Sequence, residues 1–259
     1  MLNNPDAEVA LWAAAVVANG GSVSTARLGI ISQLVRRFKS EGVWALTDDI
    51  WLLAAENATQ GLVSLKQRRT STVENSPTFT PDRGYVFNGT SNYIDTGFVP
   101  TSHCVVATGT SIGLSAYERA NVAANGKIVI GATTSGNRQL RLSPCNASGA
   151  IIGYANSSAA TSTAGVGTSA GLSSLQRSGS AFSIYKNGVS IGLTQPAVIG
   201  ATNPLTQILI GAAWEVSAPG SFRAASVAFA SIEAAMSDAQ RLAQYNAVQA
   251  WVTAIGGRA

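Results

Sequence analysis

Alternating apolar and polar positions are clearest in the segment SIYKNGVSIG, residues 183–192. Two extended runs flank Asn187-Gly188, a dipeptide that tolerates positive φ at both central positions of a type I′ turn, so the segment predicts a two-residue β-hairpin. The predicted register places Lys186 opposite Val189, Tyr185 opposite Ser190, Ile184 opposite Ile191 and Phe182 opposite Leu193. One face of the hairpin should then be buried, and the other should be wet, carrying Ser183, Tyr185, Ser190 and Gly192.

Short apolar runs separated by turn residues continue through most of the chain after Tyr85. About eleven strand candidates follow one another, which is typical of an antiparallel β-sandwich or jelly roll. The stretch Asn156–Gly171 is rich in Ala, Ser, Thr and Gly and has no period. We expect it to be a long surface loop or an irregular edge.

The first 70 residues instead have helical spacing. One helix is predicted from Asn4-Pro5 to Gly20-Gly21 and a second from Ser22 or Ser24 to Gly42. A third, shorter helix is expected after Thr47-Asp48-Asp49, with apolar positions Ile50, Trp51, Leu53 and Ala54.

Three tryptophans, Trp12, Trp44 and Trp51, fall in this helical part. They are either core residues or a docking face for a partner. The domain organisation that follows is a helical docking unit over 1–70, a connector over 71–84 with its Pro and Gly turns, and a sandwich over 85–259. The sandwich ends in a helix, since Ser237 and Gln240 form a capping box before an apolar stripe of Leu242, Tyr245, Val248, Val252 and Ile255.

Charge is scarce in this chain of 259 residues, with 12% charged residues against 46% hydrophobic ones and a net charge of +4. The basic residues are dispersed, so we expect no nucleic-acid partner. The apolar run Leu11–Val17 is short and follows Asp6 and Glu8, which predicts neither a signal peptide nor a membrane span.

The two cysteines, Cys104 and Cys145, could be buried thiols, one internal disulfide or a bond to another subunit.

Candidate chemistry is sparse. The sequence GTSAG at 167–171 matches a nucleophile pattern, but no helix signal follows it and the single histidine, His103, lies upstream. Asn92 and Asp95 are close together, yet no carboxylate cluster accompanies them, so no metal is expected. No cofactor motif is present either, and we expect no cofactor.

Several segments together resemble the concanavalin A-like lectin/glucanase superfamily, in its broad laminin-G-like sense. They are YVFNGTSNYIDTG at 85–97, the SIYKNGVSIG hairpin, ILIGAA at 208–213, and the closing FASIEAAMSDAQRLAQYNAVQAW at 229–251. The resemblance covers roughly residues 70–259 and implies a concanavalin A-like jelly roll. Glucanases of this superfamily carry a Glu-x-Asp-x-x-Glu arrangement, which is absent here, so no catalytic residues and no enzyme activity are expected.

The N-terminal segment 6–44 is similar to the helical lead of such domains in phage and prophage proteins of alphaproteobacteria. That resemblance implies a structural component on the surface of a virion, made in the host cytoplasm, which packs against copies of itself and other virion proteins. The alternative is a glycan-binding adhesin for bacterial surface polysaccharide, with loop aromatics Tyr117 and Trp214 and the polar residues Asn92 and Asp95 as ligand contacts. The low charge and the tryptophan-rich lead favour the structural role.

Overall fold

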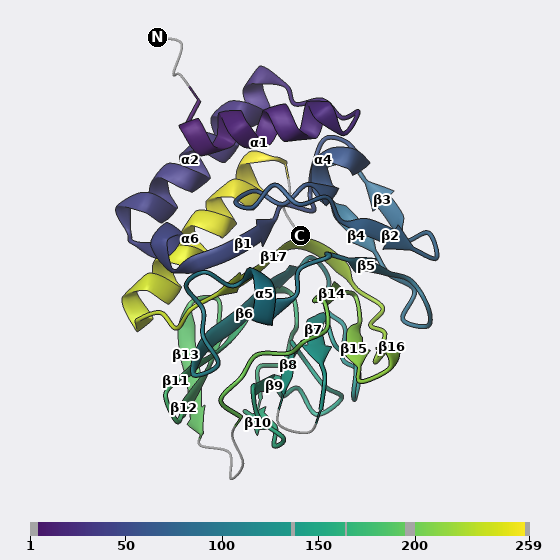
Figure 1. Ribbon diagram of the computed structural model, residues 1–259, viewed down its shortest axis with the longest axis vertical. Helices are drawn as coiled ribbons and strands as arrows, with labels where there is room; N and C mark the ends of the chain where they lie inside the picture. Colours follow the sequence, from purple (N-terminus) through teal and green to yellow (C-terminus); the bar gives the residue numbers. More distant parts are fainter. Residues whose placement is uncertain (1–4, 136–137, 164, 195–199, 257–259) are drawn as a thin grey trace.

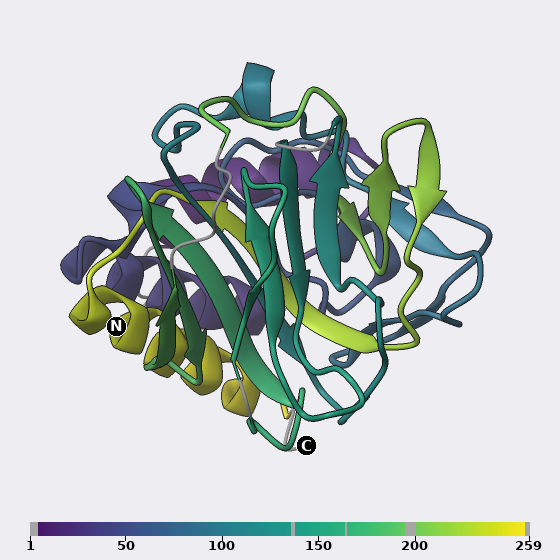
Figure 2. The same cartoon turned by 90° about the horizontal axis from the view of Figure 1, so that it is seen from below.

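Two antiparallel β-sheets stacked as a sandwich form the centre of the molecule, and helices cover the outer face of one of them (Figures 1 and 2). The computed structural model describes residues 5–135, 138–163, 165–194 and 200–256. The predicted mainly β sandwich with N-terminal helices and a C-terminal helix is therefore confirmed. Within the described residues, no helix is both long and apolar enough to span a membrane.

The first sheet has the strand order β13-β12-β11-β6-β17-β4-β3, and β1 also pairs with β17. Its strands are β1 Thr47–Trp51, β3 Thr78–Thr80, β4 Gly84–Val86, β6 Ser111–Glu118, β11 Gly171–Ser178, β12 Ala181–Lys186, β13 Val189–Thr194 and β17 Ser226–Glu233. The long strands β6, β11 and β17 lie next to one another and form the centre of this sheet.

The second sheet has the order β10-β9-β8-β7-β14-β5-β2, with β15 paired to both β7 and β16. Its strands are β2 Thr72–Glu74, β5 Tyr93–Asp95, β7 Ile130–Thr133, β8 Gln139–Ser143, β9 Ile152–Ala155, β10 Thr161–Ser162, β14 Leu209–Ile210, β15 Ala213–Glu215 and β16 Ala218–Gly220. This sheet lies on the side of the molecule away from α1, α2 and α6 (Figure 1).

The helices begin at residues whose side chains accept backbone N–H groups. Asp6 caps α1 Ala7–Ala18, Ser24 caps α2 Thr25–Ser40, and Asn57 caps α4 Ala58–Leu62. Asn4, half of the start signal predicted for the first helix, lies outside the described residues. Short helices α3 Val43–Leu46 and α5 Pro100–His103 complete the set with α6 Asp238–Ala254, whose predicted capping box of Ser237 and Gln240 is confirmed.

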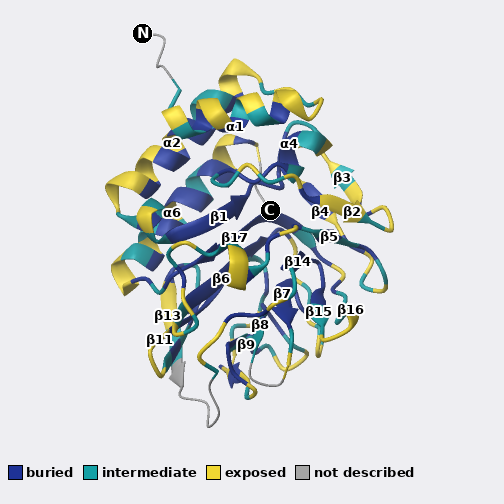
Figure 3. Cartoon of the chain, in the orientation of Figure 1, coloured by how far each residue is buried: buried dark blue, intermediate teal, exposed yellow. Residues whose placement is uncertain are grey.

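Two hydrophobic cores share the first sheet. One fills the space between the two sheets, and the other lies between the first sheet and the helices α1, α2 and α6. Figure 3 shows these helices buried on the side that faces the sheet and exposed on the outward side. The first sheet is thus buried on both faces, which is the arrangement of a three-layer packing.

The predicted third helix is wrong, because residues Thr47–Trp51 form strand β1. Ile50 lies opposite Ser231 and Trp51 opposite Ala230 on β17. All five residues, Thr-Asp-Asp-Ile-Trp, are buried, so neither their polarity nor their burial alternates with a period that could distinguish a strand from a helix. Asp48 accepts the N–H groups of Val105, Val106 and Ala107 instead of capping a helix.

The predicted hairpin forms, and its first two pairs are confirmed, with Lys186 opposite Val189 and Tyr185 opposite Ser190. A β-bulge then shifts the register, and Ile184 lies opposite Gly192 rather than Ile191. The face expected to be wet is not wet at Tyr185, which is buried under α6 and donates a 2.8 Å hydrogen bond to Asp238.

Of the two alternatives predicted for Asn156–Gly171, the irregular edge is confirmed, because β10 is the edge strand of the second sheet. The described part is not a surface loop throughout, since five of its polar residues are buried: Asn156, Ser157, Thr161, Thr163 and Ser169. The predicted stripe of α6 is confirmed at Val248, Val252 and Ile255, which are buried, and is wrong at Leu242, which is 44% exposed. Arg241 and Gln244 are buried instead, because they find hydrogen-bond partners, Arg241 with Glu233 and Gln244 with Ser231.

Residues 71–84, expected to be a connector, contribute β2 to the second sheet and β3 to the first. Residues 1–70 contribute β1 to the first sheet in addition to their helices. That residues 1–70 form an independent docking unit stays a prediction. In the structure this segment is joined to the sandwich by the backbone pairing of β1 with β17.

Candidate functional site

The outer face of the second sheet carries a cluster of polar and aromatic side chains on β7, β8, β9 and β15. Leu140 and Leu142 of β8 are buried in the core between the sheets, so the alternating residues Gln139, Arg141 and Ser143 belong to the outer face. Tyr154 on β9 lies opposite Arg141, and Ile152 lies opposite Ser143. Strand alternation thus places an arginine, a tyrosine and a serine next to one another.

Arg141 is at the centre of this cluster. Its guanidinium carbon lies 4.7 Å from the centre of the Tyr154 ring, a cation–π contact, and Nη1 lies 3.3 Å from Oε1 of Glu215 on β15. Nη2 donates to the side-chain oxygen of Gln139. On its other flank Arg141 lies opposite Gly131, where an added Cβ would come within 2.9 Å of Cγ of Arg141. Glycine at 131 therefore leaves the space that the arginine stem occupies.

A hollow of about 160 Å³ opens beside Arg141. Because one water occupies about 30 Å³ of liquid volume, this space fits a small ring or about five waters. We call it the β8–β9 hollow, and its lining residues are Gly126, Ile128, Arg141, Ser143, Ile152, Tyr154 and Ser221. Its apolar surface comes from Ile128, Ile152 and Tyr154, and its polar groups come from Arg141, Ser143 and Ser221.

Two buried polar atoms at the hollow have no hydrogen-bond partner among the described residues. They are Oγ of Ser143, a residue only 2% exposed, and Nε of Arg141. An unpartnered buried polar atom is costly, and in folded proteins such atoms usually bind a water or a ligand. Both atoms belong to residues that line the hollow.

Ser221 lines the hollow, and Glu215 lies behind the lining, in contact with Ser221 and Arg141. Ser221 has a φ of +52°, in the left-handed region that non-glycine residues rarely adopt, and its hydroxyl donates to Oε1 of Glu215. The Glu215 side chain is 41% exposed. The same carboxylate thus contacts both Arg141 and Ser221, two residues that line the hollow.

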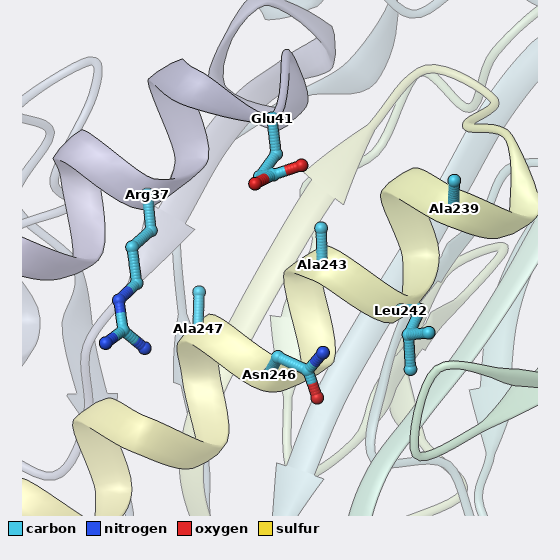
Figure 4. A pocket seen from close by; sticks show the side chains of 7 residues that line it. All are labelled: Arg37, Glu41, Ala239, Leu242, Ala243, Asn246 and Ala247. Carbon is cyan, nitrogen blue, oxygen red and sulfur yellow. The ribbon is translucent and has the colours of Figure 1, made fainter.

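Two larger hollows lie elsewhere on the molecule. One, of about 450 Å³, lies between α2 and α6, where Ala239, Ala243 and Ala247 point into the space beside Leu242 and Asn246, and Arg37 and Glu41 extend toward it (Figure 4). The other, of about 460 Å³, is lined by Asp48, Lys66, Gln67, Arg68, Ser102, His103, Val105 and Val106. Both carboxylate oxygens of Asp48 accept backbone N–H groups there.

The residues predicted to contact a ligand do not come together. Tyr117, expected on a loop, is buried in β6 under α6 and donates to Gln249, so a ligand cannot reach it. Asn92 is buried and accepts the N–H of Asn88. Asp95 on β5 accepts from Gly97 and Gln207. Trp214, half-buried on β15, is the residue next to Glu215.

The predicted docking face of tryptophans is not present on the surface. Trp12 is fully buried and donates from Nε1 to the carbonyl of Val63, and Trp51 is fully buried against Phe98. Only Trp44 is partly exposed, with the ammonium groups of Lys39 and Lys66 near its ring. Both cysteines are free thiols, Cys104 half-buried and Cys145 buried, and the burial of Cys104 raises its pKa far above the usual range.

The buried carboxylates of the first sheet are held by arginines. Glu118 pairs with Arg223 at 2.5 Å, and Glu233 pairs with Arg241 at 2.7 Å, all four side chains being fully buried. Glu233 lies opposite Gly113 on β6, five residues from Glu118, which is about 17 Å along a strand. His103 accepts the N–H of Val99 through Nδ1, and Ser169 of the GTSAG segment is buried and accepts the N–H of Val122.

The hollow could not be found from the sequence. The segments RQLRLS and AIIGYA, which contain β8 and β9, were predicted as strands, and their alternation indicates which residues share a face. The pairing of Arg141 with Tyr154 and the arrival of Glu215 from β15 depend on long-range register, for which no local signal exists.

Comparison with known proteins adds the fold relationship. No protein-family model matches the chain, and no curated protein matches it. Among solved structures, domain 4 of AbnA, a GH43 extracellular arabinanase from Geobacillus stearothermophilus in complex with arabinotriose, is 14% identical with a TM-score of 0.53, over 76% of this chain and 97% of that one. A mutant of Trypanosoma rangeli sialidase displaying trans-sialidase activity is 16% identical with a TM-score of 0.57.

The sialidase match covers 87% of this chain but only 40% of the sialidase. A second structure of that enzyme, with 2,3-difluorosialic acid as a covalent intermediate, gives a TM-score of 0.55 over 85% of this chain and 39% of that one, at 16% identity. At these identities the likeness concerns the fold alone. The chain shares a β-sandwich with these domains, as the predicted concanavalin A-like fold requires, while the phage origin of its N-terminal segment stays a prediction.

Proposed function

We propose that this chain is a non-enzymatic glycan-binding module whose β8–β9 hollow holds one sugar residue of a longer saccharide. The observation that carries the proposal is the presence, in one small hollow, of an aromatic ring and two unpartnered buried polar atoms, Oγ of Ser143 and Nε of Arg141. A sugar ring combines apolar C–H surface with hydroxyl groups, and a site for it needs both kinds of contact.

The lining provides these contacts in a fixed geometry. Tyr154 and Ile152 supply the apolar surface, and Tyr154 is held by the guanidinium of Arg141. Ser143 and Arg141 supply a hydroxyl and an N–H for sugar oxygens, and Glu215 beside Arg141 can accept from sugar hydroxyls. These five residues are all on strands, so the contacts are preorganised and lose little entropy on binding.

The fold likeness supports a binding module. The AbnA domain, matched over 97% of its length, is described with arabinotriose, so a sandwich of this size can hold an oligosaccharide. The absence of activity is supported by the carboxylates of the first sheet. Glu118 and Glu233 are about 17 Å apart and neutralised by arginines, whereas glycosidases hold their carboxyl pair within about 10 Å.

The structural role on a virion surface stays a prediction of the sequence, as does the adhesin's specificity for bacterial surface polysaccharide. The structural role has lost much of its physical support, since Trp12 and Trp51 belong to the cores of the chain itself. Glycan binding rests on a site that is open to a ligand.

Binding to a glycan array, followed by calorimetry on the best oligosaccharide, tests the proposed function. We expect Tyr154→Ala to weaken binding at least about tenfold, which corresponds to about 1.4 kcal/mol. Tyr93→Ala is the matched control, because Tyr93 is a half-buried tyrosine on β5 of the same sheet that does not line the hollow. No bound glycan, or equal affinity of the two variants, would contradict the proposal.

A further inference from the structure

We infer that the β8–β9 hollow selects neutral sugars, and that the Glu215 carboxylate excludes acidic ones by occupying the guanidinium of Arg141. This inference rests on the proposed glycan-binding function and names the class of sugar. It follows from the pairing of Arg141, which lines the hollow, with the Glu215 carboxylate.

Arg141 is the one charged residue among the described residues that line the hollow. An arginine in such a position would ordinarily attract the carboxylate of an acidic sugar, because its planar guanidinium binds carboxylates with two parallel hydrogen bonds. A site with Arg141 alone would therefore favour uronic or other acidic sugars.

The guanidinium is already occupied. Nη1 is paired with Oε1 of Glu215, Nη2 donates to Gln139, and the plane lies near the ring of Tyr154. Nε is the N–H that has no partner among the described residues. Nη1 and Nη2 each already donate to an acceptor, so a carboxylate that approached them would have to share both groups with Glu215 and Gln139.

Glu215 is held in this position from a second direction. Its Oε1 accepts the hydroxyl of Ser221, whose left-handed backbone directs the side chain to the carboxylate. On its other flank Gly220 leaves room, since an added Cβ there would lie 3.1 Å from Cδ of Glu215. The carboxylate is thus positioned by its neighbours, and an acidic sugar would bring a second negative charge against it.

A neutral sugar suits the remaining groups. Nε of Arg141 and Oγ of Ser143 can donate to hydroxyl oxygens, and the exposed part of the Glu215 carboxylate can accept from a hydroxyl. Lys127 lies in the chain between the lining residues Gly126 and Ile128 and adds positive potential of its own. The selectivity has to be measured with that lysine in place.

Glu215→Gln tests the inference, because glutamine keeps the shape of the side chain and removes its charge. Galactotriose and trigalacturonate are the probes for calorimetry, since they share ring stereochemistry and differ in the carboxylate; a neutral and acidic pair from the glycan array replaces them if the array favours another ring. The wild-type protein should bind the neutral member at least about tenfold more tightly. Glu215→Gln should raise affinity for the acidic member at least about tenfold.

Glu41→Gln is the matched control. It makes the same chemical change at an exposed glutamate beside α2, on the other side of the molecule, and should leave both affinities unchanged. Thermal unfolding of each variant verifies that it is folded.

Three outcomes separate the inference from the function on which it rests. Wild-type protein that binds the acidic member equally well or better, with loss of binding in Tyr154→Ala, overturns the charge selection and leaves glycan binding standing. Equal effects of Glu215→Gln and Glu41→Gln also overturn it. The change in affinity would then come from the loss of one negative charge anywhere on the protein and not from the position of Glu215. Failure of every glycan to bind the wild type overturns the proposed function itself.

Discussion

At the scale of single residues, Asp49 on β1 is the carboxylate with the most unusual environment. It is fully buried, and its Oδ1 accepts N–H groups from Ile50, Lys66 and Gln67 at 2.9, 3.2 and 3.2 Å. Oδ2 has no hydrogen-bond partner among the described residues. Burial raises the pKa of Asp49 from 3.8 to about 6, against the lowering effect of these hydrogen bonds.

This raised pKa makes stability depend on pH. Because the folded pKa lies above the unfolded one, Asp49 contributes stability that is complete below about pH 4 and is lost as the pH rises through about 6. The loss amounts to about 3 kcal/mol, at about 1.4 kcal/mol per pKa unit. Asp49→Asn removes this titration, so its free energy of unfolding relative to wild type should rise by that amount between pH 4 and pH 7.

Urea denaturation of both proteins at pH 4, 5, 6 and 7 measures the difference. The comparison cancels the titration of groups that do not interact with Asp49; Lys66 is not one of them, because Asp49 raises its pKa against the lowering effect of burial. A difference between the two proteins that stays constant over this range would contradict the raised pKa.

At the scale of elements, Gly188 is the point where the turn of the β12–β13 hairpin comes closest to the backbone of α6 among the described glycines. Gly188 has a φ of +78°, and an added Cβ would lie 2.8 Å from Cα of Leu242 and 2.9 Å from Cβ of Tyr245. Gly188→Ala should therefore combine a left-handed backbone cost of about 1 kcal/mol with an overpacking cost of about 1–3 kcal/mol.

Gly179→Ala separates these two costs. Gly179 is in the β11–β12 turn with a φ of +62°, and an added Cβ there meets no atom within 4 Å. Chemical denaturation should show a clearly larger loss for Gly188→Ala than for Gly179→Ala. Equal losses would mean that α6 does not press on the hairpin.

Features that depend on neighbouring residues in the chain could be predicted from the sequence, whereas those that depend on distant residues could not. The Asn187-Gly188 turn, the Ser24 cap and the Ser237 capping box are local, and each was predicted. Strand β1 was predicted as a helix, because its pairing partner β17 lies about 180 residues away and its buried run has no period. The candidate site was missed for the same reason, since Arg141, Tyr154 and Glu215 meet only through sheet register.

At the scale of the whole molecule, the helices and the sandwich share one structural layer. β1 pairs with β17 beside β4, and its residues alternate between the two cores, with Trp51 in the core between the sheets and Ile50 in the core under the helices. Leu53 and Leu52, which follow β1, continue this division between the two cores. The N-terminal segment thus fills both cores.

Removal of residues 1–70 should consequently destroy the fold. The fragment would lack β1, expose the edge of β17 and lose the apolar cover of α6, including that from Trp12 and Phe38. We expect it to aggregate in light scattering and to unfold without a cooperative thermal transition, whereas the full chain shows a sharp one. A monodisperse fragment with cooperative unfolding would support an independent docking unit over 1–70. That outcome would also require another segment to cover β17, since its edge carries unpaired backbone groups wherever β1 is absent.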